Sequence, residues 1–236
     1  MAFFAGLVDA VAGGGGLIQV PALFAAYPDA PPATLLSTNK VSAVGGTINA
    51  ARRYLRHVSL PWAIVGPAIV AGFVGSLLGA SAVSNFPAEP LRKALPFVLL
   101  FLLFYTWFQP SLGEAHAPKG ANRYQQIKAI LLGLIIGFYD GFFGPGTGSF
   151  FVFLLVRWLG YDFLNASVAA KLLNLSSNIA ALVLFTLKGH VWWHLALPMA
   201  MANVAGSLLG TRLALQHGAG FVRGMFIVVV SALICK

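Results

Sequence analysis

The sequence predicts an all-α integral membrane protein built from two tandem repeats. Of the 236 residues, 58% are hydrophobic and only 9% are charged, and the mean hydropathy is +0.83. A water-soluble domain usually has about a quarter of its residues charged. So little charge cannot cover a soluble surface, which argues against a water-soluble enzyme or a nucleic-acid-binding protein. The net charge of +9 comes from Lys and Arg in short polar gaps, as in the cytoplasmic loops of membrane proteins.

Apolar runs of helical length follow one another along the whole chain. A transmembrane helix needs about 20 apolar residues, and several runs reach that length. Residues 109–126 form the only long polar stretch. We therefore expect a first membrane repeat at 1–108, a polar linker at 109–126 and a second membrane repeat at 127–236, all within a single transmembrane domain. The runs lie at 2–27, 33–51, 61–83, 94–108, 127–156, 164–187, 191–215 and 219–235.

A duplication is visible when the sequence is shifted by 131 residues, which overlays the second half on the first without a gap. Twenty of the 105 overlaid positions are identical, against roughly nine expected from composition alone. The matches include the rare residue types Asp, Lys and Trp, so we predict a duplication rather than a chance match. They include Asp9 with Asp140, Lys40 with Lys171, Trp62 with Trp193, and 75–79 with 206–210.

The two repeats could be parallel or inverted, since transporters use both arrangements. If the first run of each half, 2–27 or 127–156, dips into the membrane and returns, the halves are inverted about a pseudo-two-fold axis. Nine basic residues then lie on one side of the membrane and four on the other. If all eight runs cross the membrane instead, the division is eight and five. Cytoplasmic loops are enriched in Lys and Arg, so these counts favour inversion. The nine are Arg52, Arg53, Arg56, Lys119, Arg123, Lys128, Arg157, Arg212 and Arg223, and the four are Arg92, Lys93, Lys188 and Lys236.

Glycines interrupt the first apolar run of each half. These stretches cannot continue a helix, because Gly costs about 1 kcal/mol per residue and Pro about 3. Paired interruptions at matching places are the best sequence indication of a transporter binding site. A new helix begins after each break, and its free N–H groups can hold an anion. The predicted substrate-binding residues here are Gly13, Gly14, Gly15, Gly16, Gly144, Gly146, Thr147 and Gly148.

Small residues can instead serve close helix packing, which is the alternative interpretation of the two breaks. We favour packing for two sets spaced by four on one helical face. These sets are Ala71, Gly75 and Gly79, and Ala202, Gly206 and Gly210.

Four charged residues lie inside apolar sequence. Asp9 and Asp140 each precede a break by four residues, and Lys40 and Lys171 lie in the following runs. A charge near the bilayer centre costs about 2.5–3.5 kcal/mol, so such residues are functional candidates. We predict that the lysines bind the substrate and that the aspartates balance them or carry protons. The alternative is a structural Asp–Lys pair within each half, whose attraction roughly cancels its desolvation cost.

Neutral polar side chains flank the two lysines. On a cavity wall they would donate hydrogen bonds to an oxyanion, and between helices they would be ordinary interhelical bonds. Both interpretations stay open. The predicted substrate-binding members are Thr38, Asn39 and Asn174, and Ser176, Ser177 and Asn178 lie beside them.

His190 and His194 are spaced by four residues, so a helix would present both on one face, as a metal pair requires. No third ligand lies near them in the sequence, and Trp192 and Trp193 indicate an aromatic belt at the membrane interface. We expect no metal and no cofactor. A membrane enzyme or assembly factor with a His190/His194 metal site is the alternative function of a different class.

The motifs around the breaks resemble those of the TauE/SafE sulfite-exporter family, also called the sulfonate uptake permease family. Residues 6–18 (GLVDAVAGGGGLI), 38–40 (TNK) and 137–148 (GFYDGFFGPGTG) carry the resemblance, which covers essentially the whole chain. It implies a polytopic inner-membrane permease for sulfite, sulfonates or related small anions. Fewer residues precede Asp9 than precede Asp140 in its repeat, so we expect a shortened N-terminus, without a removable signal peptide.

From the residues and the resemblance together, we predict a permease of the cell inner membrane, not an enzyme, that transports a small anion by alternating access. The expected partners are sulfite or an organosulfonate and the lipid bilayer, with no nucleic acid. Proton coupling and the oligomeric state stay open. An anion channel is the nearest alternative, although no continuous ring of charge is visible in the sequence.

Overall fold

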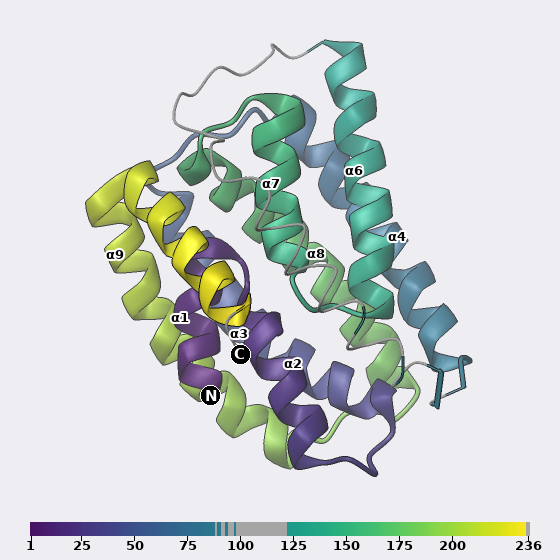
Figure 1. Ribbon diagram of the computed structural model, residues 1–236. Coiled ribbons are helices and arrows are strands. Elements are labelled where there is room, and N and C mark those ends of the chain that lie inside the picture. Colours follow the sequence, from purple (N-terminus) through teal and green to yellow (C-terminus); the bar gives the residue numbers. More distant parts are fainter. Residues whose placement is uncertain (88, 91–92, 94–96, 98–121, 235–236) are drawn as a thin grey trace.

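The computed structural model describes residues 1–87, 89–90, 93, 97 and 122–234, and this part of the chain is all-helical with eight helices and no strands (Figure 1). Most of the expected run 94–108 and of the linker 109–126 therefore lies outside the described residues. The helices are α1 (Ala2–Ala12), α2 (Gly15–Ala26), α3 (Pro32–Tyr54), α4 (Trp62–Ser84), α6 (Arg123–Phe142), α7 (Thr147–Leu159), α8 (Phe163–Leu187) and α9 (Trp193–Ile234).

Helices end at both glycine stretches. α1 stops at Gly13, whose φ of 76° lies in the left-handed region that favours glycine. The N–H of Gly13 donates to the carbonyl oxygen of Asp9 over 2.9 Å, and α2 begins two residues later. In the second half, α6 ends at Phe142 and α7 begins at Thr147, with positive φ at Gly144 and Gly146. The expected runs 191–215 and 219–235 correspond to two helical segments of α9 (Trp193–Ile234), which meet at a kink where Gly218 has a non-helical backbone, with φ 70° and ψ −162°.

The small-residue stripes serve helix packing, which confirms that interpretation for the two sets spaced by four. α4 packs closely on α6, and α9 packs closely on α1. A methyl group added at Gly79 would collide with the carbonyl oxygen of Phe138, and one added at Gly206 with that of Phe3. Glycine at these positions therefore allows the two backbones to approach directly.

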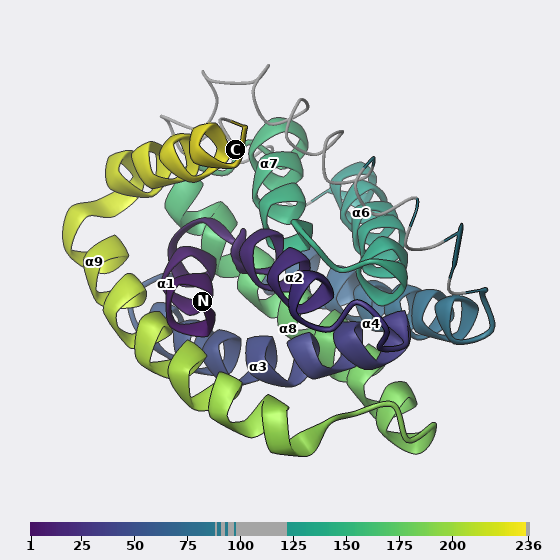
Figure 2. The same cartoon turned by 60° about the horizontal axis from the view of Figure 1, so that its bottom comes forward.

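Contacts recur at positions 131 residues apart. The hydroxyl of Ser76 donates to the carbonyl of Ser177 over 2.6 Å, and that of Ser207 donates to the carbonyl of Gly46 over 2.7 Å. In Figure 2 the pairs α1/α9 and α4/α6 flank a centre that contains α3 and α8. In Figure 1 α6 starts at the top and runs down, whereas α1 starts at the N-terminus and runs up. α4 and α9 are likewise opposed.

Polarity in the described bundle is the reverse of that in a water-soluble protein. Val70, Ile135 and Met201 are 65%, 59% and 75% exposed, whereas Lys40 and Asp140 are buried. α4 and α8 are long and apolar enough to cross a membrane by length and composition. Apolar side chains facing outward with charges inside are the arrangement that a lipid environment favours.

Candidate functional site

The two breaks cross each other near the middle of the bundle. Gly13 in the first break lies so close to Gly148 at the start of α7 that a methyl group on either would overlap the other's backbone. Gly16, in the first turn of α2, lies next to the backbone of Gly144 and Pro145. The fold therefore brings together the N-termini of α2 and α7, one from each half of the chain.

A polar cavity of about 20 Å³ lies between the two breaks. That volume accommodates about one water molecule. Of the predicted site residues, Gly14, Thr38 and Lys171 do not border the cavity, and the others do. The lining consists of Asp9, Gly13, Gly15, Gly16, Gln19, Asn39, Lys40, Ala43, Asp140, Gly144, Gly146, Thr147, Gly148, Asn174, Asn178 and Asn203.

The four buried charges form two ion pairs, and each pair joins one half of the chain to the other. The ammonium group of Lys40 lies 2.9 Å from Oδ2 of Asp140, and that of Lys171 lies 3.2 Å from Oδ2 of Asp9. The alternative of an Asp–Lys pair within each half is therefore wrong. The offset of 131 aligns each lysine with the other lysine, but it does not indicate which carboxylate lies within reach of either.

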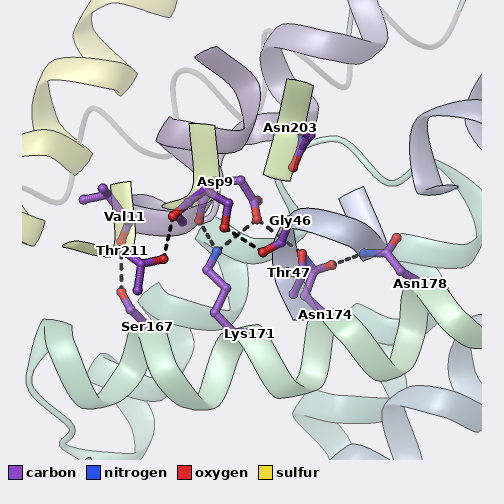
Figure 3. A network of polar contacts seen from close by, with 12 residues as sticks. Asp9, Val11, Gly46, Thr47, Ser167, Lys171, Asn174, Asn178, Asn203 and Thr211 are labelled. Carbon is purple, nitrogen blue, oxygen red and sulfur yellow. Dashed lines mark hydrogen bonds and ion pairs between the residues drawn. The ribbon is translucent and has the colours of Figure 1, made fainter. Parts of the chain in front are cut away.

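Lys171 also stabilises the first break directly. It extends from α8 toward Asp9, as Figure 3 shows, and donates to the backbone carbonyl of Asp9 as well as to the carboxylate. The N–H of Gly13 donates to the same carbonyl. Lys171 thus places a positive charge at the C-terminal end of α1, where the helix dipole favours a cation.

A chain of amide groups continues from the other pair along the cavity wall. Lys40 donates to Oδ1 of Asn178 over 3.0 Å, and Nδ2 of Asn178 donates to Oδ1 of Asn174 over 2.9 Å. On the opposite side, Gln19 donates to the hydroxyl of Ser42 over 2.9 Å. Oδ1 of the buried Asn39 has no hydrogen-bond partner within the part of the chain that the structure describes.

The helix N-termini give the cavity wall an electropositive component without a large excess of formal charge. Each lysine is paired with a carboxylate, so the two pairs together are formally neutral. The first N–H groups of a helix lack partners within that helix, and each N-terminus carries roughly half a positive charge. The starts of α2 and α7 both border the cavity, so their fields add there.

Two of the sequence expectations fail on local geometry. The hydroxyl of Thr38 donates back to the carbonyl of Thr34 within α3 over 2.7 Å, so it does not face the cavity. α9 begins at Trp193, so His190 lies before the helix and the expected common face with His194 does not exist. Among the described residues, no group of three or more His, Cys, Asp or Glu side chains could hold a metal ion.

Three lining residues were missed in the sequence, namely Gln19, Ala43 and Asn203. Gln19 and Asn203 are uncharged amides inside long apolar runs, and that pattern was the available signal. Ala43 matches Asn174 under the offset of 131, so the duplication pointed to it as well. Asn178, which follows Lys171 in the sequence, also lines the cavity and is not among the predicted site residues.

Comparison with known proteins identifies the family. The family model described as Sulfite exporter TauE/SafE matches residues 1–236. The chain belongs to the TauE/SafE sulfite exporter family. This confirms the resemblance of the glycine and Asp motifs to that family.

Proteins similar to this chain carry the name probable membrane transporter. The chain is 38% identical over 236 residues to "Probable membrane transporter protein YfcA" of Escherichia coli (strain K12), covering 100% of this chain and 86% of the relative. A "Probable membrane transporter protein" of Haemophilus influenzae is 36% identical over 230 residues, covering 96% of this chain and 87% of that one.

A third relative, "Probable membrane transporter protein ORF9" of Sinorhizobium sp, is 35% identical over 234 residues, covering 98% of this chain and 87% of the relative. No solved structure matches the chain. The chain is a membrane transporter of the TauE/SafE family, and these names indicate a transporter rather than an enzyme.

Proposed function

We propose that this transporter carries small oxyanions, sulfite or an organosulfonate, across the cell inner membrane through the cavity between the two breaks. One observation carries the proposal: the N-termini of α2 and α7, from different halves, border one polar cavity together with Lys40. Backbone N–H groups at helix N-termini bind anions, and glycine lets a ligand approach the backbone closely. Among the described residues of the cavity wall, Lys40 would supply the one formal cation.

The size of the cavity supports transport by alternating access. A volume of about 20 Å³ holds about one water molecule, whereas sulfite has four heavy atoms. The described conformation is therefore a closed one in the proposed cycle, and substrate enters when the two halves move apart. The Lys–Asp pairs join the halves, so they would break and re-form during that movement.

We also propose that the halves are inverted repeats related by a pseudo-two-fold axis through the cavity. The recurring contacts at an offset of 131 and the opposed directions of α1 and α6 support this arrangement. α3 ends, α6 begins and α7 ends at the upper end of the bundle in Figure 1, which places Arg52, Arg123 and Arg157 there. By the positive-inside rule this end would face the cytoplasm.

Proton coupling would arise from Asp140. An anion bound to Lys40 competes with Asp140 for the same ammonium group, which lies 2.9 Å from the carboxylate. A buried carboxylate that loses its cation is left as an uncompensated charge, which a bound proton would neutralise. One proton would then travel with each anion, and a pH gradient would drive transport.

The test is flux into liposomes that contain the purified protein, measured for sulfite, methanesulfonate and acetate with and without a pH gradient. We expect saturable flux that is fastest for sulfite or methanesulfonate and that rises when the proton and anion gradients have the same direction. Flux that grows linearly with concentration would indicate a channel. Absence of sulfite and sulfonate flux above that of empty liposomes would refute the proposed cargo.

A further inference from the structure

A second pocket lies at the end of the bundle where α3 ends, far from the cavity between the breaks. Its volume is about 320 Å³, which is within the range of small-molecule sites, roughly 300–1,000 Å³. Three guanidinium groups and one imidazole gather there, and no carboxylate is among the described residues of the lining. The lining residues are Arg53, Arg56 and His57 from the end of α3 and Arg212, Leu215 and Gln216 from α9.

The guanidinium groups have few protein partners. Nη1 of Arg53 donates to the carbonyl of Leu208 over 3.3 Å. In the part of the chain that the structure describes, no ion pair involves Arg53, Arg56 or Arg212. Each guanidinium has five N–H donors in a planar fork, so most of the donors in this pocket remain for a ligand.

The fold itself does not require these arginines, as the opposite end of the bundle shows. Under the offset of 131, α8 and α4 take the places of α3 and α9, and they pack against each other in the same way. The corresponding polar groups bond within their own helix: Ser84 donates to the carbonyl of Ala80, and Asn85 to that of Ser81. The positions that correspond to the pocket hold Leu184, Leu187, Lys188, Ser81, Ser84 and Asn85, with no arginine.

A crossing α3 would bring the pocket to the depth of lipid headgroups. α3 has 23 residues, which gives a length of about 35 Å, and the hydrocarbon core is about 30 Å thick. The end of α3, and with it Arg53 and Arg56, therefore reaches the membrane surface when α3 crosses. Arg56 and Arg212 are both exposed, and Leu215 gives the pocket one apolar wall.

We propose that this pocket binds a phosphate group at the membrane surface. The guanidinium fork matches phosphate oxygens in a bidentate manner, and basic pockets between transmembrane helices bind anionic headgroups. The phosphate can belong to an anionic phospholipid or be free in solution, and the chemistry of recognition is the same. The proposal is independent of the cargo of the central cavity.

The test uses isothermal titration calorimetry on the purified full chain in a neutral detergent. The probes are dioctanoyl phosphatidylglycerol, inorganic phosphate and, as the zwitterionic comparison, dioctanoyl phosphatidylcholine. We expect binding of phosphatidylglycerol or inorganic phosphate, weakened about 30-fold in the double variant Arg56→Gln/Arg212→Gln, at about 1 kcal/mol for each cation. Lys188→Gln removes an exposed cation at the opposite end and should leave the dissociation constant unchanged.

Each result has a definite meaning. Pocket-dependent binding of phosphatidylglycerol alone identifies a lipid site, and pocket-dependent binding of inorganic phosphate identifies a free anion as a ligand. A second variant, Gln216→Glu, adds a carboxylate to an exposed position of the wall and should weaken the same binding about fivefold, the effect of about 1 kcal/mol. The proposal is overturned if neither probe binds, or if both pocket variants bind as the wild type does.

Discussion

The two Lys–Asp pairs occupy corresponding positions in the two halves, yet their surroundings differ. Lys40 and Asp140 both border the central cavity, and Lys40 also donates to Asn178. In the other pair only Asp9 borders the cavity, and Lys171 donates to the backbone at the end of α1. We infer that the duplicated pair has diverged, with Lys40 available to a ligand and Lys171 holding the first break in place.

The largest effect on stability is expected for Lys171→Met. Removing one partner of a buried ion pair costs about 3–5 kcal/mol, and here a charged hydrogen bond to the carbonyl of Asp9 is lost as well. Lys40→Met also loses a charged hydrogen bond, to Oδ1 of Asn178, but that side chain can rotate to another partner, whereas the carbonyl at the end of α1 is fixed. We therefore expect Lys171→Met to be about 1 kcal/mol more destabilising than Lys40→Met. The free energy of unfolding of purified variants in mixed micelles measures the difference. Equal losses for the two variants would remove the distinction between the pairs.

Alanine substitution should also destabilise the protein more at Gly13, beside the Lys171 pair, than at Gly144, beside the Lys40 pair. Alanine at Gly13 or Gly144 would have to adopt the left-handed backbone of the glycine, which costs about 1–2 kcal/mol of stability. At Gly13 the methyl group also overlaps the backbone of Gly148, which adds about 1–3 kcal/mol. At Gly144 the nearest atoms are the carbonyl oxygen of Asp140 at 3.4 Å and Nζ of Lys40 at 3.6 Å.

Gly66→Ala in α4 is the matched control for these glycine variants. A methyl group at Gly66 meets no heavy atom within 4 Å, so alanine there should stabilise the helix by about 0.5–1 kcal/mol. Thermal unfolding of the three variants should give the order Gly66→Ala above Gly144→Ala above Gly13→Ala. A Gly13→Ala protein as stable as Gly144→Ala would contradict the tight crossing of the breaks.

A double variant distinguishes a structural role of the Lys40–Asp140 pair from a role in transport. Lys40→Met/Asp140→Asn leaves no unpaired buried charge, so its free energy of unfolding should return to within about 1 kcal/mol of the wild type. Sulfite flux into liposomes should nevertheless stay as low as in Lys40→Met. If flux recovers together with stability, the pair has a structural role only.

The smallest effect is expected at Asn39, which borders the cavity near Lys40. Its Oδ1 has no partner in the described part of the chain, so Asn39→Leu should change the free energy of unfolding by less than about 1 kcal/mol. The KM for sulfite should rise about threefold, because a hydrogen-bonding group of the cavity wall is lost. An unchanged KM would exclude Asn39 from the substrate site.

The sequence predicted the helical class, the family and the position of the breaks well. Those features depend on composition and on local backbone preferences, because the glycines at 13–16 and the glycines and proline at 144–148 weaken a helix enough to end it. The offset of 131 also pointed to the four buried charges, because Asp and Lys are rare in this chain.

The partners of these charges could not be predicted, since pairing depends on how the halves pack. Lys40 contacts Asp140, 100 residues away, and Lys171 contacts Asp9, 162 residues away. The rotation of each helix likewise decided which polar groups reach the cavity. Thr38 turns back to its own helix, whereas Gln19 and Asn203 line the wall.

The most direct test is equilibrium binding of sulfite to purified wild type, Lys40→Met and Lys171→Met by isothermal titration calorimetry. Loss of a charge-assisted hydrogen bond of about 1.5–3 kcal/mol should weaken binding by Lys40→Met about 10- to 100-fold. Lys171→Met, which loses a group outside the cavity, should stay within about threefold of the wild type. Wild-type affinity in Lys40→Met, or equal weakening in both variants, would contradict a substrate site at Lys40 between the two breaks.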